Sequence, residues 1–342
     1  MTPTADDRVT ELLEEAARLA TDGEDAEAGA VALEAATLLP VGDPDRHSTF
    51  ASAGALLARA GRHLMAADAW SGAAAAAPDD LGRARYLTAE GEAARLAGAW
   101  WRSVDAHERA LVLAEAHDEA SLVTAVIAQN LAMTFKYTGR FEEAEPLYRR
   151  ALVIAERQGE QRLVAVICHI LGGLAHARGD HAAGIPWARR SVRERESLDN
   201  PVGLAADRGA LAGLLIDAGD LVEARELLND ARRVFVEHLG DDHHEVAVVD
   251  GNLAAVALAT DDLAAAERHA RSALRVKEHL LGSEHPELAV TLTTLGSIRR
   301  RRGDHREAAR LHRRALAVLR PAVDPAHPLL RTIQDNLEVA TS

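Results

Sequence analysis

The feature that most constrains this chain is an internal repeat of about 40 residues. With Gly139 as the origin within residues 130–156, equivalent positions recur through the chain at spacings of 37 to 42 residues. The residues at these positions are Gly23, Gly61, Gly98, Gly139, Gly179, Gly219, Asp261 and Gly303. A period of this length predicts small units that must stack on their neighbours, because no single unit can bury its apolar face alone.

Two further positions of the repeat hold small residues in every unit. Five residues after the origin the chain has Ala28, Ala66, Ser103, Ala144, Gly184, Ala224, Ala266 and Ala308. Twelve residues after it stand Ala35, Ala73, Ala110, Ala151, Ser191, Ala231, Ala273 and Ala315. Small side chains at fixed positions allow close helix packing. The unit is therefore predicted to be two apolar helices joined by a glycine turn.

Composition agrees with an all-α chain. Aromatic residues make up 3% of the sequence, and the apolar content is mostly Ala and Leu, which favours helices over a β-sandwich or barrel. The net charge of −14 makes a general nucleic-acid binder a poor interpretation. The single cysteine, Cys168, excludes an internal disulfide and a cysteine-based zinc cluster, and we expect it to be a buried, inert thiol.

With these marks the chain resembles the tetratricopeptide repeat family over nearly all of its length. The first two units also carry the closing prolines, Pro40 and Pro78. The last three units resemble the longer repeats of kinesin light chains, with linkers that read LGDDHHEVA, LGSEHPELA and VDPAHPLLR. The resemblance implies an α-solenoid that winds as a right-handed superhelix.

Eight units and a capping helix account for the sequence, so we expect one solenoid domain over residues 1–342. The predicted repeats cover residues 6–43, 44–81, 82–119, 120–160, 161–200, 201–242, 243–284 and 285–327, followed by a capping helix over 328–340. Within the helices, the register places Trp70 and Trp100 in the core. Trp101 falls one step off that face, where packing between repeats is favoured over exposure.

No motif for catalysis, cofactor binding or metal binding is evident. Phosphate-binding loops, dinucleotide fingerprints and the common hydrolase, kinase and metalloprotease motifs are all missing from the sequence. His243, His285 and His327 recur in the linkers, but one repeat step of about 10 Å is too long for shared ligation at about 2.1 Å. We therefore expect no catalytic residue, no cofactor and no metal.

The resemblance implies that the first helix of each unit lines a concave groove. Its groove positions lie about 13, 10, 6 and 3 residues before the turn. The expected partner-binding residues are Arg85, Glu92, Arg95, Gln129, Met133, Lys136, His169, Gly173, His176, Gly209, Gly213, Gly251 and Arg300. The glycines among them follow one stripe. That stripe is explained either by drift among small residues or by a pocket that admits a bulky group against the backbone.

These observations favour a non-catalytic scaffold that binds a peptide or a partner's helix in the groove. A regulator that senses a ligand or peptide is the alternative, and an enzyme using His169, His176 or Glu92 is a weaker one. Arg95 and Lys136 are cations in an acidic protein, which favours an acidic partner segment. A homo-oligomer stays open, whereas nucleic acid and membranes are not expected as partners.

The N-terminal segment is acidic and amphipathic, which does not fit a secretory signal peptide. No apolar run approaches the roughly 18 residues of a membrane span. We therefore expect a cytoplasmic protein. Lysine occurs only at Lys136 and Lys277 while arginine is abundant, and this usage favours a bacterial source.

Overall fold

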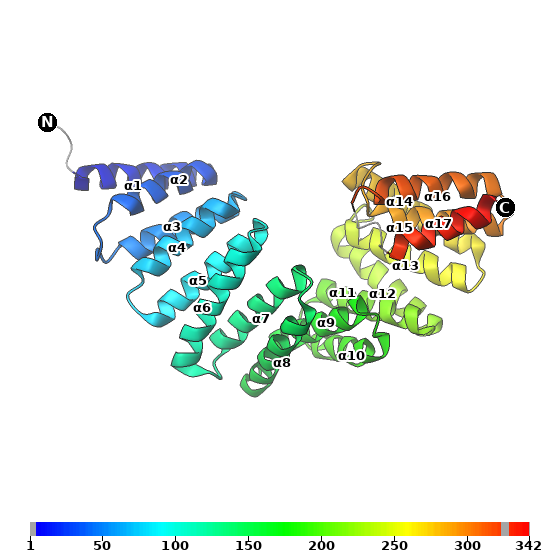
Figure 1. Cartoon of the computed structure of the whole chain (residues 1–342), viewed down its shortest axis with the longest axis horizontal. Coiled ribbons are helices and arrows are strands. Elements are labelled where there is room, and N and C mark those ends of the chain that lie inside the picture. Colours follow the sequence, from blue (N-terminus) through cyan, green and yellow to red (C-terminus); the bar gives the residue numbers. More distant parts are fainter. Residues whose placement is uncertain (1–4, 323–327, 342) are drawn as a thin grey trace. The chain divides into compact units, whose positions relative to one another are not determined.

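The computed structural model describes residues 5–322 and 328–341, and every regular element in these two ranges is an α-helix (Figure 1). The chain divides into two compact units, one ending at Ile167 and the other beginning at Cys168. The all-α prediction is confirmed. The expectation of one domain over residues 1–342 stays a prediction.

Successive helices pack side by side in chain order within each unit (Figure 1). The first unit contains α1 (Ala5–Thr21), α2 (Asp25–Leu38), α3 (Arg46–Arg59), α4 (His63–Ala76), α5 (Asp80–Leu96), α6 (Trp100–Asp118), α7 (Leu122–Tyr137) and α8 (Phe141–Gln158). Helix α9 (Gln161–Ala177) includes the boundary. The second unit contains α10 (His181–Glu196), α11 (Pro201–Ala218), α12 (Leu221–Leu239), α13 (His244–Ala259), α14 (Leu263–Leu281), α15 (Leu288–Arg301), α16 (His305–Leu319) and α17 (Pro328–Thr341).

All eight predicted turn positions lie between the two helices of a hairpin, in left-handed backbone conformation. Their φ angles run from 61° at Asp261 to 87° at Gly219. Glycine suits this conformation because it has no Cβ, and aspartate is among the few other residues that adopt it. Among the described residues, Asp261 is the one non-glycine with positive φ. The repeat read from the sequence is therefore the physical repeat of the fold.

The two small positions of the repeat are buried in all eight hairpins. At Gly184 even a methyl group would crowd its neighbours, because a Cβ there would lie 2.8 Å from Leu214 Cδ2 and 3.1 Å from the Gly172 carbonyl oxygen. Helices that approach this closely exclude water and interlock, since protein interiors are packed as densely as organic crystals. The small residues therefore fix how near neighbouring helices lie.

A second size match joins the two helices of several hairpins. A glycine seven residues before the turn faces a ring nine residues after it, in the pairs Gly54–Trp70, Gly91–His107 and Gly296–His312. At Gly91 a Cβ would lie 2.6 Å from the His107 ring. Burial of His107, with a smaller contribution from the charge of Arg95, lowers its pKa to about 4. This ring is accordingly neutral at neutral pH, and it fills the space that Gly91 leaves.

The expectation for two tryptophans is wrong. Trp100 is 39% exposed and Trp101 77% exposed. Both residues begin α6 directly after the turn, before that helix enters the core, and Trp100 stacks on Tyr137 with the ring centroids 6.2 Å apart. Trp70 lies deeper in its helix and does pack inside the hairpin, on Gly54.

Two of the recurring linker histidines accept hydrogen bonds from backbone N–H groups at the N-termini of helices. His243 Nδ1 accepts a hydrogen bond from the backbone N–H of Glu245 at 3.2 Å, and His285 Nδ1 accepts one from Glu287 at 3.3 Å. Both groups compensate for backbone donors that have no partner in the first helical turn. The third histidine of this series, His327, lies outside the described residues. No described helix is both long and apolar enough to cross a lipid bilayer.

Enlarging one of the small positions should destabilise the fold. Ala224 is fully buried, so Ala224→Leu should overpack the joint and lower the free energy of unfolding by about 1–3 kcal/mol. The adjacent Arg225 is exposed, and Arg225→Leu should change it by less than about 0.5 kcal/mol. Urea unfolding followed by circular dichroism measures both. Equal losses would mean that the register is wrong.

Candidate functional site

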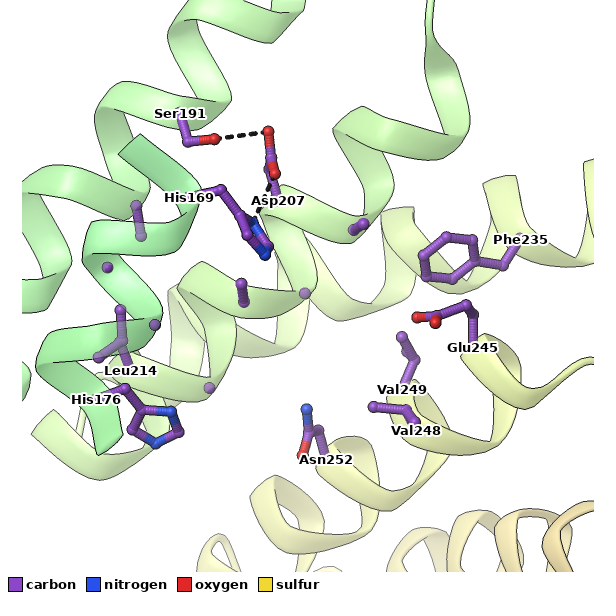
Figure 2. A pocket seen from close by; sticks show the side chains of 17 residues that line it. His169, His176, Ser191, Asp207, Leu214, Phe235, Glu245, Val248, Val249 and Asn252 are labelled. Atoms are coloured by element: carbon purple, nitrogen blue, oxygen red, sulfur yellow. Dashed lines mark hydrogen bonds and ion pairs between the residues drawn. The ribbon is translucent and has the colours of Figure 1, made fainter. Parts of the chain in front are cut away.

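The second unit contains a cavity of about 290 Å³ bounded by α9 to α13 (Figure 2). Its lining is His169, Gly172, Gly173, His176, Ala188, Ser191, Ala206, Asp207, Gly209, Ala210, Gly213, Leu214, Phe235, Glu245, Val248, Val249 and Asn252. Five of the predicted partner-binding residues belong to it: His169, Gly173, His176, Gly209 and Gly213. The structure thus brings together, in one hollow, the residues predicted on two successive first helices.

The glycines of the predicted stripe open onto this hollow. A Cβ built at Gly173, Gly209 or Gly213 would meet no atom within 4 Å. The neighbouring Gly172 differs, because a Cβ there would lie 3.3 Å from the Ala188 backbone nitrogen. Gly172 is therefore needed for helix packing, whereas the stripe glycines leave bare backbone beside empty space. This is the arrangement that the pocket interpretation requires.

The polar wall of the cavity is organised around Asp207 of α11, whose side chain is only 2% exposed. Its carboxylate accepts hydrogen bonds from His169 Nδ1 at 2.8 Å and from Ser191 Oγ at 2.7 Å (Figure 2). It also accepts one from Arg195 Nε at 2.5 Å. Burial alone would raise the pKa of Asp207, but the hydrogen bonds from His169, Arg195 and Ser191 hold this pKa below its ordinary value. The group therefore stays an anion.

This network fixes the chemistry that His169 offers to a ligand. Because the carboxylate of Asp207 only accepts, Nδ1 of the His169 ring carries the donated proton. The other nitrogen, Nε2, is then an acceptor while the ring is neutral. Asp207 thus both orients the ring and selects the tautomer in which it meets a bound group.

The opposite wall comes from α12 and α13. Phe235, Val248 and Val249 supply apolar surface, and Glu245 and Asn252 supply polar groups (Figure 2). Glu245 is half-buried, and its carboxylate makes no ion pair with any residue that the structure describes. The cavity is therefore lined by glycine backbone on one side, by apolar side chains on the other, and by the unpaired carboxylate of Glu245.

Six of the predicted residues lie in the first unit, on α5 and α7. Arg85 and Gln129 line two shallow, mainly apolar depressions there. Glu92 Oε1 accepts a hydrogen bond from Asn130 at 2.6 Å, and the Arg95 guanidinium lies over the Tyr137 ring, 5.6 Å from its centroid.

The other two of these six, Met133 and Lys136, are half-buried, and burial lowers the pKa of Lys136. Two more predicted residues, Gly251 and Arg300, belong to the second unit but lie outside the cavity lining. A binding role for these eight positions stays a prediction.

Sequence reasoning missed the carboxylates and the ring of this cavity, Asp207, Glu245 and Phe235. One signal was available for Asp207: an acidic residue stands within a mainly apolar helix, twelve residues before its turn. Asp250 does the same eleven residues before Asp261, and it is fully buried, with Arg232 Nε at 2.8 Å and His269 Nδ1 at 2.9 Å. Such residues indicate buried ion pairs, but their partners lie on other helices and the repeat does not reveal them.

A family model described as tetratricopeptide repeat matches residues 123–197, 204–279 and 245–320. The chain belongs to the tetratricopeptide repeat family. No curated protein sequence is significantly similar to it.

Solved structures show the same fold at low sequence identity. BtubC (BKLC) from P. vanneervenii is 23% identical, with a TM-score of 0.54 over 67% of this chain and 94% of that one. The signal transduction ATPase with a tetratricopeptide repeat sensor from Pyrococcus horikoshii is 13% identical, with a TM-score of 0.69 over 97% of this chain and 48% of that one. The apo form of RapI is 13% identical, with a TM-score of 0.65 over 80% and 97%.

Removing the carboxylate that organises the cavity should be costly. Asp207→Ala leaves Arg195, whose side chain is 12% exposed, without its anion, and should lower the free energy of unfolding by about 3–5 kcal/mol. Asp217→Ala, which removes a 41% exposed partner of His176, should cost about 1 kcal/mol or less. Chemical denaturation of both variants makes the comparison. Similar losses would contradict a buried ionic network at Asp207.

Proposed function

We propose that this chain is a non-catalytic protein-interaction module that holds a partner segment in the cavity of its second unit. The observation that carries the proposal is the set of stripe glycines, Gly173, Gly209 and Gly213, whose missing side chains leave the cavity floor open. Glycine inside a helix costs about 1 kcal/mol relative to alanine. Three such glycines line this one cavity, and each of them lowers the stability of its helix. A side chain of a bound partner that occupies the space beside them would account for all three.

The lining supports a segment with one apolar side chain and a neighbouring hydrogen-bond donor. The apolar group would lie on the glycines, against Val248 and Val249. Its neighbour would donate to the carboxylate of Glu245 or to Nε2 of His169. Binding of this kind derives its affinity from a few buried contacts and its selectivity from the polar groups at their edge.

The predicted preference for an acidic partner belongs to the first unit. It rests on Arg95 and Lys136, and we keep it as a proposal for the surface of α5 and α7. In the cavity itself the unpaired charge is that of Glu245, which favours a basic or donor group. A partner that spans both units would therefore present segments of different charge to each.

A regulator that senses a small ligand is the second candidate. A cavity of about 290 Å³ is close to the lower end of the range for small-molecule sites, roughly 300 Å³. One of the structures with the same fold is described as having a tetratricopeptide repeat sensor. A free amino acid or short peptide of the same chemistry would make the same contacts as a partner segment. The two candidate functions differ in the ligand, a protein segment or a small molecule, but both place it in the same cavity.

Filling the floor of the cavity should abolish binding without unfolding the chain. Peptides selected from a display library on the full chain serve as the probe, and their dissociation constants are measured for each variant. Gly213→Leu places a side chain in the hollow and should weaken binding roughly tenfold or more. Its helix should gain rather than lose stability, because leucine is the better helix former.

Arg225→Leu is the control. Arg225 is exposed on α12 and lies outside the cavity lining. The variant should bind selected peptides as the wild type does. Unchanged binding by Gly213→Leu, or a library that yields no ligand, would contradict the proposed function.

A further inference from the structure

Beside the cavity, three side chains that bind metals in other proteins converge at one turn. They are His176 in the last turn of α9, His181 at the start of α10, and Asp217 near the end of α11. One ligand atom from each lies within 4.8 Å of the other two. Among the described residues, this is the one group of three histidine, cysteine or acidic side chains with that geometry.

The distances suit a metal ion bound between the three groups. His176 Nε2 lies 2.8 Å from Asp217 Oδ2, and His181 Nδ1 lies 3.6 Å from the same oxygen. Ligands about 2.1 Å from a tetrahedral ion are about 3.4 Å from one another. The three atoms therefore need only small side-chain rotations to share one ion.

His181 supplies a second observation that points to a ligand. Its Nδ1 atom is buried and has no hydrogen-bond partner, since Asp217 lies just beyond hydrogen-bonding distance. A buried nitrogen without a partner is unfavourable by about 1–3 kcal/mol. Coordination of an ion through its lone pair would remove that cost.

The backbone holds the cluster in place. The left-handed turn at Gly179, with φ of 75°, joins the helices that carry the two histidines. Their rings lie 5.5 Å apart between centroids. Because all three residues stand at the ends of packed helices, the arrangement does not depend on a long loop.

A second carboxylate in this unit, that of Glu287, also has a histidine partner, but its surroundings differ from those of Asp217. His244 Nε2 lies 2.8 Å from Glu287 Oε1, and Lys277 Nζ lies 3.0 Å from the same oxygen. There the second group is a cation that cannot ligate a metal, so the cluster is an ion-pair network. At Asp217 the second group is an imidazole, which can be a ligand.

We propose that His176, His181 and Asp217 bind a divalent transition-metal ion such as Zn²⁺, Co²⁺ or Ni²⁺. Two imidazoles with one carboxylate suit these ions, whereas Mg²⁺ and Ca²⁺ prefer oxygen ligands alone. Three protein ligands leave a coordination position for water or for an incoming group. Because His176 also lines the cavity, the ion would stand at its edge, where a carboxylate, thiol or imidazole of a bound partner could coordinate it.

Metal titration of the full, untagged chain tests this proposal. Isothermal titration with Zn²⁺ at pH 7.5 should show one ion per chain, and Co²⁺ should give the visible absorption of a low-symmetry site with nitrogen and oxygen ligands. His181→Ala and Asp217→Asn should each weaken Zn²⁺ binding by roughly tenfold or more. Retained helical circular dichroism shows that both variants are folded.

His244→Ala is the matched control, because it removes a histidine paired with a carboxylate but no proposed ligand. It should bind Zn²⁺ as the wild type does. The proposal is overturned if the wild type takes up no stoichiometric ion, or if His181→Ala and Asp217→Asn bind as tightly as the wild type. Metal titration needs no protein partner, so its result tests the metal site independently of the proposed function.

Discussion

The close contact between neighbouring helices is the constraint on which the rest of this structure depends. Sixteen small residues, two in each of eight hairpins, are buried where helices meet, and at Gly184 a Cβ would already crowd the neighbouring helices. Helices held this close need tight connections, which the left-handed turns provide. Size complementarity also acts within hairpins, where Gly54, Gly91 and Gly296 accept large rings. What recurs from repeat to repeat is thus the size of the residue at each position more than its chemical type.

The space available to a side chain also distinguishes the glycines needed for helix packing from those that are not. Gly172 and Gly184 face backbone or side-chain atoms at 3.3 Å or less, whereas Gly173, Gly209 and Gly213 face open space. Helix packing therefore explains the first group, and for the second we propose a bound group. The buried Asp207 network beside them joins side chains of α9, α10 and α11, and Asp207 orients His169. A binding site built in this way stands on rigid elements rather than on loops.

The fold could be predicted from the sequence to a large extent because its information is local and repeated eight times. Turn glycines and small residues recur at fixed spacings, so each repeat supports the assignment of the others. The exposed Trp100 and Trp101 were placed wrongly because a helix start was treated as helix interior. In the site, the stripe glycines followed from the register. Asp207, Glu245 and the cluster around Asp217 did not, because these contacts join residues of different helices and occur once each.

The central claim is that the cavity between α9 and α13 is where this protein binds its partner. Hydrogen–deuterium exchange of the full chain, with and without a peptide that binds it, tests the claim most directly. Binding in the cavity predicts slower amide exchange in residues 169–176, 206–214 and 245–252, because an occupied cavity suppresses local opening of the helices that line it. Protection confined to α5 and α7 of the first unit, or to α15 and α16, would contradict the claim.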